Sequence, residues 1–215
     1  MSVQFISEVA VENYTTVPAA IAAGANRIEL NDNLAVGGTT VSRGVMSETA
    51  RYAGEHHVPV TAMIRPRGGD FVYNDTEIKI MEADLFSAQE LGLDGVAFGA
   101  LTPDHKLDVD ALEQLIAAAS GMSLTFHMAF DELAPADQLT AIDWLVDHDF
   151  DRILTHGGPL TAPISDHLDH LQALITAAAG RITILPGGGI TAENAATIAE
   201  TLQVHALHGT KVIDY

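Results

Sequence analysis

The sequence predicts one α/β domain, a TIM-type (β/α)8 barrel over residues 1–215 that lacks a full eighth helix. Three observations support this prediction. Eight short apolar segments alternate with stretches of helical pattern, which is typical of parallel strands covered by helices. The chain has 215 residues, and roughly 200–250 residues suffice for such a barrel. No segment has the polar character of an edge strand, which favours closure over the main alternative, a doubly wound open sheet.

The strand candidates share one pattern. Each is a short apolar run that the chain enters through Gly or a polar pair and leaves through Gly, Asn or Pro, as in GANRIEL and AGRITILPGGG. Buried parallel strands have this pattern. The eight expected strands cover residues 3–9, 27–30, 58–65, 95–99, 123–127, 152–155, 181–185 and 204–208.

The clearest helix pattern covers residues 76–91, where apolar residues recur at spacings of three and four and Gly92 follows as a stop. These apolar residues are Ile78, Met81, Leu85 and Ala88. Similar patterns predict one helix that ends before Gly121 and another that ends before Gly180. Thr191 is the expected cap of a further helix that runs to about residue 201.

The last expected strand ends near residue 208, which leaves no room for an eighth helix before Tyr215. Outward residues of that strand, such as Ala206 or Leu207, are then expected to expose apolar surface unless another chain covers them. The sequence therefore predicts a homo-oligomer, in the simplest case a dimer.

Charge and composition exclude several classes of function. The formal net charge is −19 with His neutral, so the long-range field repels nucleic acid and acidic lipid surfaces. The chain has no cysteine, which removes disulfides, thiolate nucleophiles and Cys-based metal sites. No apolar run approaches the roughly 18–20 residues of a membrane-spanning helix, and the start of the chain lacks a basic signal-peptide region. We therefore expect a soluble, cytoplasmic protein.

Polar residues gather at the carboxyl ends of the expected strands, where barrels of this type bind ligands. Glu29 ends one strand and His127 ends another, in the segment TFHMAFD, which also contains Asp131. An imidazole with nearby carboxylates suits general acid–base catalysis, so these three are the candidate catalytic residues.

The segment MIRPRGGD places Arg65 and Arg67 two residues apart at a strand exit stiffened by a proline. One interpretation is a clamp for an anionic substrate. The other is that both arginines form structural ion pairs, for example with Asp70, Glu8 or Glu29.

Two loops near the end of the chain form a second candidate for anion binding. PGGGIT contains Gly187, Gly188 and Gly189 between a strand and a helix, and HGTK contributes Thr210 and Lys211. Loops after the seventh and eighth strands of such barrels often bind phosphate. The alternative is a tight turn in which the glycines only supply positive φ angles.

A metal site is a further possibility, because His156 ends the strand that follows the one ending at His127. Together with Glu29 these two imidazoles would form a reasonable set of metal ligands. The alternative for each histidine is a structural, hydrogen-bonded role.

Six blocks in order along nearly the whole chain resemble the CutC family of copper homeostasis proteins. They are AAGANRIELNDNLAVGGTTVS, AMIRPRGGDFVYND, ELGLDGVAFGAL, TFHMAFD, RILTHGG and ILPGGGIT. The resemblance implies a TIM-type barrel, a cytoplasmic location, dimeric or higher association and copper binding. Many relatives have Cys where this chain has Asn31, and often Arg where it has Met128, so the family's cysteine copper site is not carried over. Copper would need His, Met or carboxylate ligands.

The sequence thus leads to two main hypotheses. The first is a CutC-like cytoplasmic protein of copper homeostasis that binds copper without cysteine ligands. The alternative is a barrel enzyme that acts by acid–base chemistry on a small anionic or phosphorylated metabolite. A purely structural or interacting barrel ranks third. The expected partners are a copper ion or a small anion, with no nucleic acid and no membrane.

Overall fold

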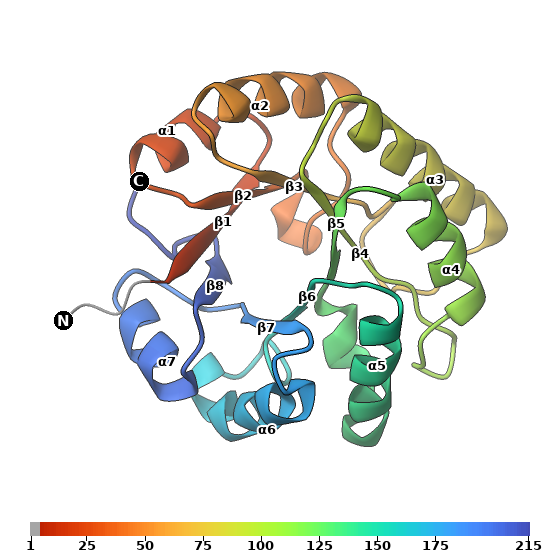
Figure 1. The fold of residues 1–215 in the computed structure, drawn as a ribbon, viewed down its shortest axis with the longest axis vertical. Coiled ribbons are helices and arrows are strands. Elements are labelled where there is room, and N and C mark those ends of the chain that lie inside the picture. Colours follow the sequence, from red (N-terminus) through yellow and green to blue (C-terminus); the bar gives the residue numbers. More distant parts are fainter. Residues whose placement is uncertain (1–4) are drawn as a thin grey trace.

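A computed structural model describes residues 5–215 and confirms the predicted barrel. Eight parallel strands form a ring, and seven α-helices cover its outside (Figure 1). The strands are β1 Ile6–Glu12, β2 Arg27–Asn31, β3 Val60–Met63, β4 Gly95–Phe98, β5 Ser123–Phe126, β6 Arg152–Thr155, β7 Thr183–Pro186 and β8 Ala206–Gly209. The helices are α1 Val17–Ala22, α2 Arg43–Glu55, α3 Asp75–Glu90, α4 Val109–Ala118, α5 Pro135–Asp147, α6 Leu168–Ala178 and α7 Ala195–Leu202.

The sheet runs β7-β6-β5-β4-β3-β2-β1-β8, so β1 pairs with both β2 and β8. The strands β7 and β8 lie side by side without a strand ladder between them (Figure 1). Just beyond their carboxyl ends, Thr191 and Lys211 form a parallel bridge, and the Ala192 N–H donates to the Lys211 carbonyl at 2.8 Å. The barrel is therefore nearly closed, and this join lies at the end where ligands bind.

The main apolar core lies between the strands and the helices. The four apolar residues that predicted α3 are all buried, which confirms the face that this helix turns to the sheet. Asn74 caps α3 by accepting from the N–H groups of Thr76 and Glu77, and the Glu77 carboxylate accepts from the Asn74 N–H. This capping box explains why the helix begins at Asp75.

The strand β1 lies further along the chain than the sequence predicted. It covers Ile6–Glu12 rather than residues 3–9, of which residues 3 and 4 lie outside the described residues. The cause is tertiary, since β1 takes its register from both neighbours: Glu8 lies opposite Arg27 on one side and His208 on the other. Glu8 is therefore in the middle of a strand, not at its end.

The last helix also begins later than predicted. It starts at Ala195 and not directly after Thr191, because Thr191 is held in the bridge to Lys211. Asn194 joins the intervening turn: its side chain accepts from the Thr191 N–H and donates to the Gly189 carbonyl. The glycine-rich loop thus crosses to β8 before the helix can form.

The missing eighth helix is confirmed, since β8 is followed only by turns up to Tyr215 in the described chain. The expected exposure of β8 is wrong, however. Ala206 points into the barrel, where it packs with Leu154 and Leu185, and is 7% exposed. Leu207 is completely buried in the main core, to which Val212 of the C-terminal segment also belongs. The homo-oligomer therefore stays a prediction, but exposed apolar residues on β8 no longer support it.

None of the helices between residues 5 and 215 combines the length and the apolarity needed to cross a membrane.

Candidate functional site

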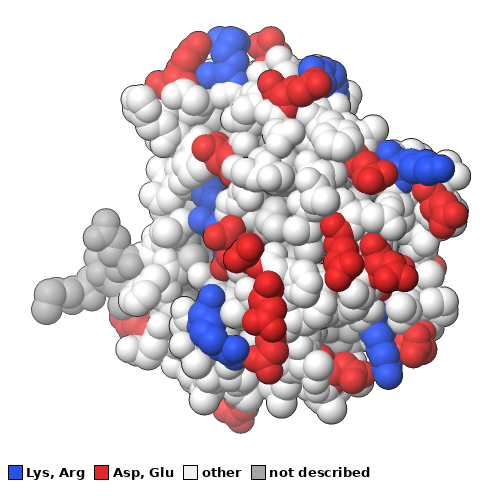
Figure 2. Space-filling view, turned by 45° about the vertical axis from the view of Figure 1, so that its right-hand side comes forward, with Lys and Arg blue, Asp and Glu red and all other residues white. Residues whose placement is uncertain are grey.

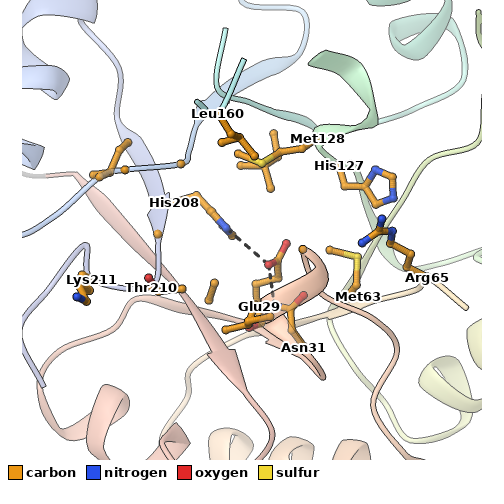
Figure 3. Close-up of a pocket in the computed structure, with 18 of the residues that line it drawn as sticks. Glu29, Asn31, Met63, Arg65, His127, Met128, Leu160, His208, Thr210 and Lys211 are labelled. Carbon is orange, nitrogen blue, oxygen red and sulfur yellow. Dashed lines mark hydrogen bonds and ion pairs between the residues drawn. The ribbon is translucent and has the colours of Figure 1, made fainter. Parts of the chain in front are cut away.

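The carboxyl ends of the strands surround a cavity of about 430 Å³. Apolar side chains form much of its wall and a smaller number of polar ones point into it, as is typical of small-molecule sites. Figure 3 shows Arg65 on one side of the cavity and Lys211 on the other, with Glu29 between them. The polar or charged side chains that line it are Glu29, Asn31, Arg65, His127, Thr191, His208, Thr210 and Lys211.

Arg65 follows β3 and is 3% exposed. Its guanidinium donates three hydrogen bonds, all to backbone carbonyls: those of Val36 and Gly38, at 2.8 and 3.0 Å, and that of Gly69. Its Nε has no partner, and no carboxylate within residues 5–215 forms an ion pair with Arg65. Arg65 is therefore a buried cation beside the cavity whose charge is not neutralised by an ion pair.

His127 follows β5 and lies close to Arg65, as Figure 3 shows. Its Nδ1 accepts from the Ala129 N–H at 3.2 Å, so in the neutral ring the proton lies on Nε2. That Nε2 is buried and has no hydrogen-bond partner among residues 5–215. Burial is the main cause that lowers the pKa of His127 to about 3, and the positive charge of Arg65 contributes to this shift, so the ring stays neutral. His127 is thus suited to donate a hydrogen bond and not to act as a base.

Four residues on three neighbouring strands form a charged network inside the barrel. The Glu8 carboxylate is paired at one oxygen with Arg27, while its other oxygen lies 2.8 Å from His208 Nδ1. The opposite ring nitrogen, His208 Nε2, lies 3.6 Å from the Glu29 carboxylate. The network therefore runs from Arg27 through Glu8 and His208 to Glu29, with Glu29 and His208 at the cavity wall.

The network separates the proton affinities of its two carboxylates. Although burial alone would raise the pKa of Glu8, the hydrogen bond and charge of His208 and the charge of Arg27 lower it to about 2. Burial raises the pKa of Glu29, and the negative charge of Glu8 adds to this rise. Burial opposes protonation of His208, but Glu29 and Glu8 outweigh it and raise its pKa. Glu8 is thus a fixed negative charge, whereas Glu29 binds a proton more readily than an ordinary carboxylate.

Glu29 has one oxygen free of protein partners. Its Oε2 accepts from the Asn31 amide at 2.8 Å, whereas Oε1 is buried and has no hydrogen-bond partner in the described structure. Asn31 lies two residues along β2, so both side chains point to the inside of the barrel.

Arg67, the second arginine of the predicted clamp, does not line the cavity. It pairs with Glu77 of α3 and with Asp70, and it donates to the carbonyl of Val72 at 2.8 Å. The two interpretations of this segment thus divide between its arginines: Arg65 faces the cavity, and Arg67 forms structural ion pairs.

Asp131 and His156 also lie outside the cavity lining. The Asp131 carboxylate accepts from the Thr155 hydroxyl and from the N–H groups of His156 and Gly157, so it braces the loop after β6. The His156 ring nitrogens face backbone carbonyls, with Nε2 3.1 Å from that of Ala162. Between residues 5 and 215 the single group of three potential metal ligands is Glu8, Glu29 and His208, so His127, His156 and Glu29 are not brought together.

The two loops of the expected phosphate site meet at the rim of the cavity. Gly188 and Gly189 have φ of 82° and 73°, and their N–H groups have no acceptor within residues 5–215. Thr210 and Lys211 lie beside them, and Lys211 forms no ion pair in the described chain. Gly187 differs, since its N–H donates to the Thr155 carbonyl and it does not line the cavity.

The sequence placed Glu8 and His208 among the polar residues expected at strand ends, but neither was a predicted catalytic, anion-binding or metal-binding residue. The signal that could have identified them is the alternation within SEVAVE, where Val9 and Val11 join the outer core and Glu8 and Ala10 face inward. In an open sheet a charged residue in mid-strand is unexpected, but inside a barrel it can form a buried ion pair.

Comparison with known proteins agrees with the six sequence blocks. A family model described as CutC family matches residues 5–213. A CutC family protein of Enterococcus faecalis is 57% identical over 97% of this chain and 100% of its own length. The human copper homeostasis protein cutC homolog is 41% identical over 91% of this chain and 69% of its own length. A CutC structure from Streptococcus agalactiae, 45% identical, superposes with a TM-score of 0.95 over 98% of this chain and 100% of its own. By sequence and by fold, this chain belongs to the CutC family.

Proposed function

We propose that this CutC-family protein is an enzyme that binds a small anionic metabolite in the cavity and moves a proton with Glu29. The observation that carries the proposal is Arg65, a buried cation at the cavity wall that pairs with no carboxylate in the described part of the chain. A charge removed from water is costly unless it is paired. An anionic ligand would supply the missing negative charge.

The rim supports a second contact with the same ligand. Gly188 and Gly189 offer N–H groups that have no acceptor in the part of the chain that the structure describes, and Thr210 and Lys211 add a hydroxyl and a positive charge. Backbone N–H groups with a nearby cation form a common phosphate-binding arrangement. Since Arg65 and Lys211 lie on opposite sides of the cavity, a ligand with electronegative groups at both ends, one of them a phosphate, fits best (Figure 3).

Thermal unfolding tests this proposal. We expect inorganic phosphate and small phosphorylated carboxylates or carbonyl compounds to raise Tm. At 100 times the Kd, a ligand should add about 2.7 kcal/mol to the free energy of unfolding. Arg65→Gln and Lys211→Ala should each reduce the shift, and Arg43→Gln, which alters an exposed ion pair on α2, should retain it. The proposal fails if no such compound raises Tm, or if Arg65→Gln responds like the unmodified protein.

Copper binding, which the names of the relatives suggest, has less support from the donor atoms. The chain has no cysteine, and both oxygens of Glu8 are already held by Arg27 and His208. The soft donors at the cavity are the thioethers of Met63 and Met128, and thiolates bind Cu(I) more strongly. This donor set does not fit a tight Cu(I) site.

We therefore expect this chain to lose Cu(I) to a competing chelator that a two-thiolate site would resist. Spectrophotometric titration with a colorimetric Cu(I) chelator measures this, and retention of one equivalent per chain would contradict the expectation. The cytoplasmic location and the homo-oligomer remain predictions, which cell fractionation and sedimentation velocity would check.

A further inference from the structure

We propose that the reaction is a proton transfer at a carbon next to a carbonyl group, and that the substrate is a small phosphorylated carbonyl compound. Glu29 is the base, and His127 with Arg65 polarises the carbonyl. This inference rests on the proposed function and adds to it the class of reaction and of substrate.

The first argument is the separation of donors from acceptors in the cavity. His127 Nε2 and Arg65 Nε are buried donors without a hydrogen-bond partner within residues 5–215, and they belong to cavity-lining residues on the same side, at the ends of β5 and β3. The unpartnered carboxylate oxygen, Glu29 Oε1, lies on β2. A carbonyl oxygen at the donors would therefore place the adjacent carbon towards the carboxylate.

The second argument is the protonation of His127. Because Nδ1 accepts from the Ala129 N–H, the neutral ring presents Nε2–H as a donor, and the lowered pKa keeps it neutral. A neutral imidazole stabilises a developing enolate oxygen by hydrogen bonding, an arrangement known from other barrel enzymes.

The third argument is the support behind Glu29. Asn31 holds one of its oxygens, and His208 lies within 3.6 Å of the same oxygen. The raised pKa of Glu29 makes it a stronger base than an ordinary carboxylate. His208, held in turn by Glu8, is a positioning residue that stabilises the ionised carboxylate.

The step balances without an oxidant or a cofactor. Glu29 removes the proton from carbon, and the electron pair of that C–H bond becomes the new C=C bond. The carbonyl π pair moves onto oxygen, where His127 and Arg65 donate hydrogen bonds. Return of the proton from Glu29 to the same carbon restores the carbonyl compound or yields its epimer. We do not propose an imine mechanism, because Lys79 and Lys106 do not line the cavity, and Lys211, which does, is exposed at its rim, where it is expected to contact the phosphate.

Deuterium exchange tests the inference directly. The protein is incubated in D2O with dihydroxyacetone phosphate, glyceraldehyde 3-phosphate, ribulose 5-phosphate and erythrose 4-phosphate, and NMR records loss of the C–H signal next to the carbonyl. We expect exchange above the protein-free rate with whichever of these raises Tm most. Glycerol 3-phosphate, which lacks the carbonyl, should show none.

Two variants identify the roles. Glu29→Gln should reduce the exchange rate at least 100-fold while retaining the ligand-dependent rise in Tm. His127→Gln should slow exchange by a similar factor, and Glu90→Gln, an exposed control on α3, should leave it unchanged. If a compound raises Tm but none exchanges, this inference is overturned, while the binding of an anionic metabolite in the cavity stands. If Glu29→Gln exchanges normally, the role of Glu29 in proton transfer is wrong in both proposals. If none of the compounds raises Tm, the proposed function fails and the inference fails with it.

Discussion

His127 shows how one neighbour sets the chemistry of a single residue. Its ring is buried, Phe71 packs against it with 4.9 Å between ring centroids, and Arg65 lies close to it. Burial and this positive charge both disfavour the imidazolium. The histidine that the sequence suggested as an acid–base group is therefore better suited to donate one hydrogen bond.

The pKa of His127 predicts a pH dependence of stability. It lies near 3 in the folded chain, below the ordinary value of 6.5, so the unfolded chain takes up the proton first as the pH falls. The free energy of unfolding therefore decreases as the pH falls from about 6.5 towards 3. The contribution of His127 to it is about 2 kcal/mol smaller at pH 5 than at pH 7.5. His127→Gln should remove that part of the difference in guanidinium unfolding at the two pH values. Equal pH dependence in both proteins would contradict the prediction.

At the scale of elements, the loop between β3 and α3 is joined to the helix by Arg67. Its guanidinium binds Glu77, which also completes the cap of α3, and Asp70 within the loop. One arginine of the IRPRGG block thus faces the cavity while the other supports the loop that carries it.

Arg67→Ala should therefore lower stability without weakening ligand binding. We expect a loss of about 1–2 kcal/mol, since the side chain is one-third exposed and solvent screens its ion pairs. The Tm should fall, while the phosphate-dependent rise in Tm should match that of the unmodified protein. Lys79→Ala on the exposed side of α3 is the control. Loss of the phosphate response in Arg67→Ala would restore the clamp interpretation for this residue.

The strands β1, β2 and β8 are linked by a buried network whose centre is Glu8. Glu8→Gln would leave Arg27 without its counter-charge inside the barrel, so we expect a loss of about 3–5 kcal/mol in the free energy of unfolding. Glu90→Gln, which breaks an exposed ion pair with Arg43, should cost less than about 1 kcal/mol. Urea unfolding at pH 7.5 compares the two. Similar small losses would show that the network contributes little.

At the scale of the whole molecule, the excess of acidic residues opposes compactness. Figure 2 shows Asp and Glu side chains spread over one face, several of them beside the few basic ones. With a formal net charge of −19, the chain repels itself, and salt screens that repulsion.

We expect 0.5 M sodium chloride to raise Tm by about 2–4 °C, the shift that about 1 kcal/mol produces in a domain of this size. Arg65→Gln should show the same rise, which separates general screening from binding of chloride at the cavity. A Tm that stays constant or falls with salt would contradict the prediction.

Much of the fold was predictable because it depends on local patterns. The glycine stops and the spacing of apolar residues located α3 to within one residue at each end, and β6 was located without error. The positions of β1 and α7 were not predictable in this way. The first depends on register against two other strands, and the second depends on the bridge between Thr191 and Lys211.

For this protein, local sequence determined the alternation of strands and helices and the end of the barrel at which polar residues gather. The tertiary structure decided how those residues divide. It turned Arg65 to the cavity and Arg67 to α3, and it placed Glu8 beside His208, 200 positions away in the chain. The physical reason is that periodicity determines which face a side chain occupies, whereas hydrogen-bond partners and counter-charges depend on contacts that form only when distant strands close into a barrel.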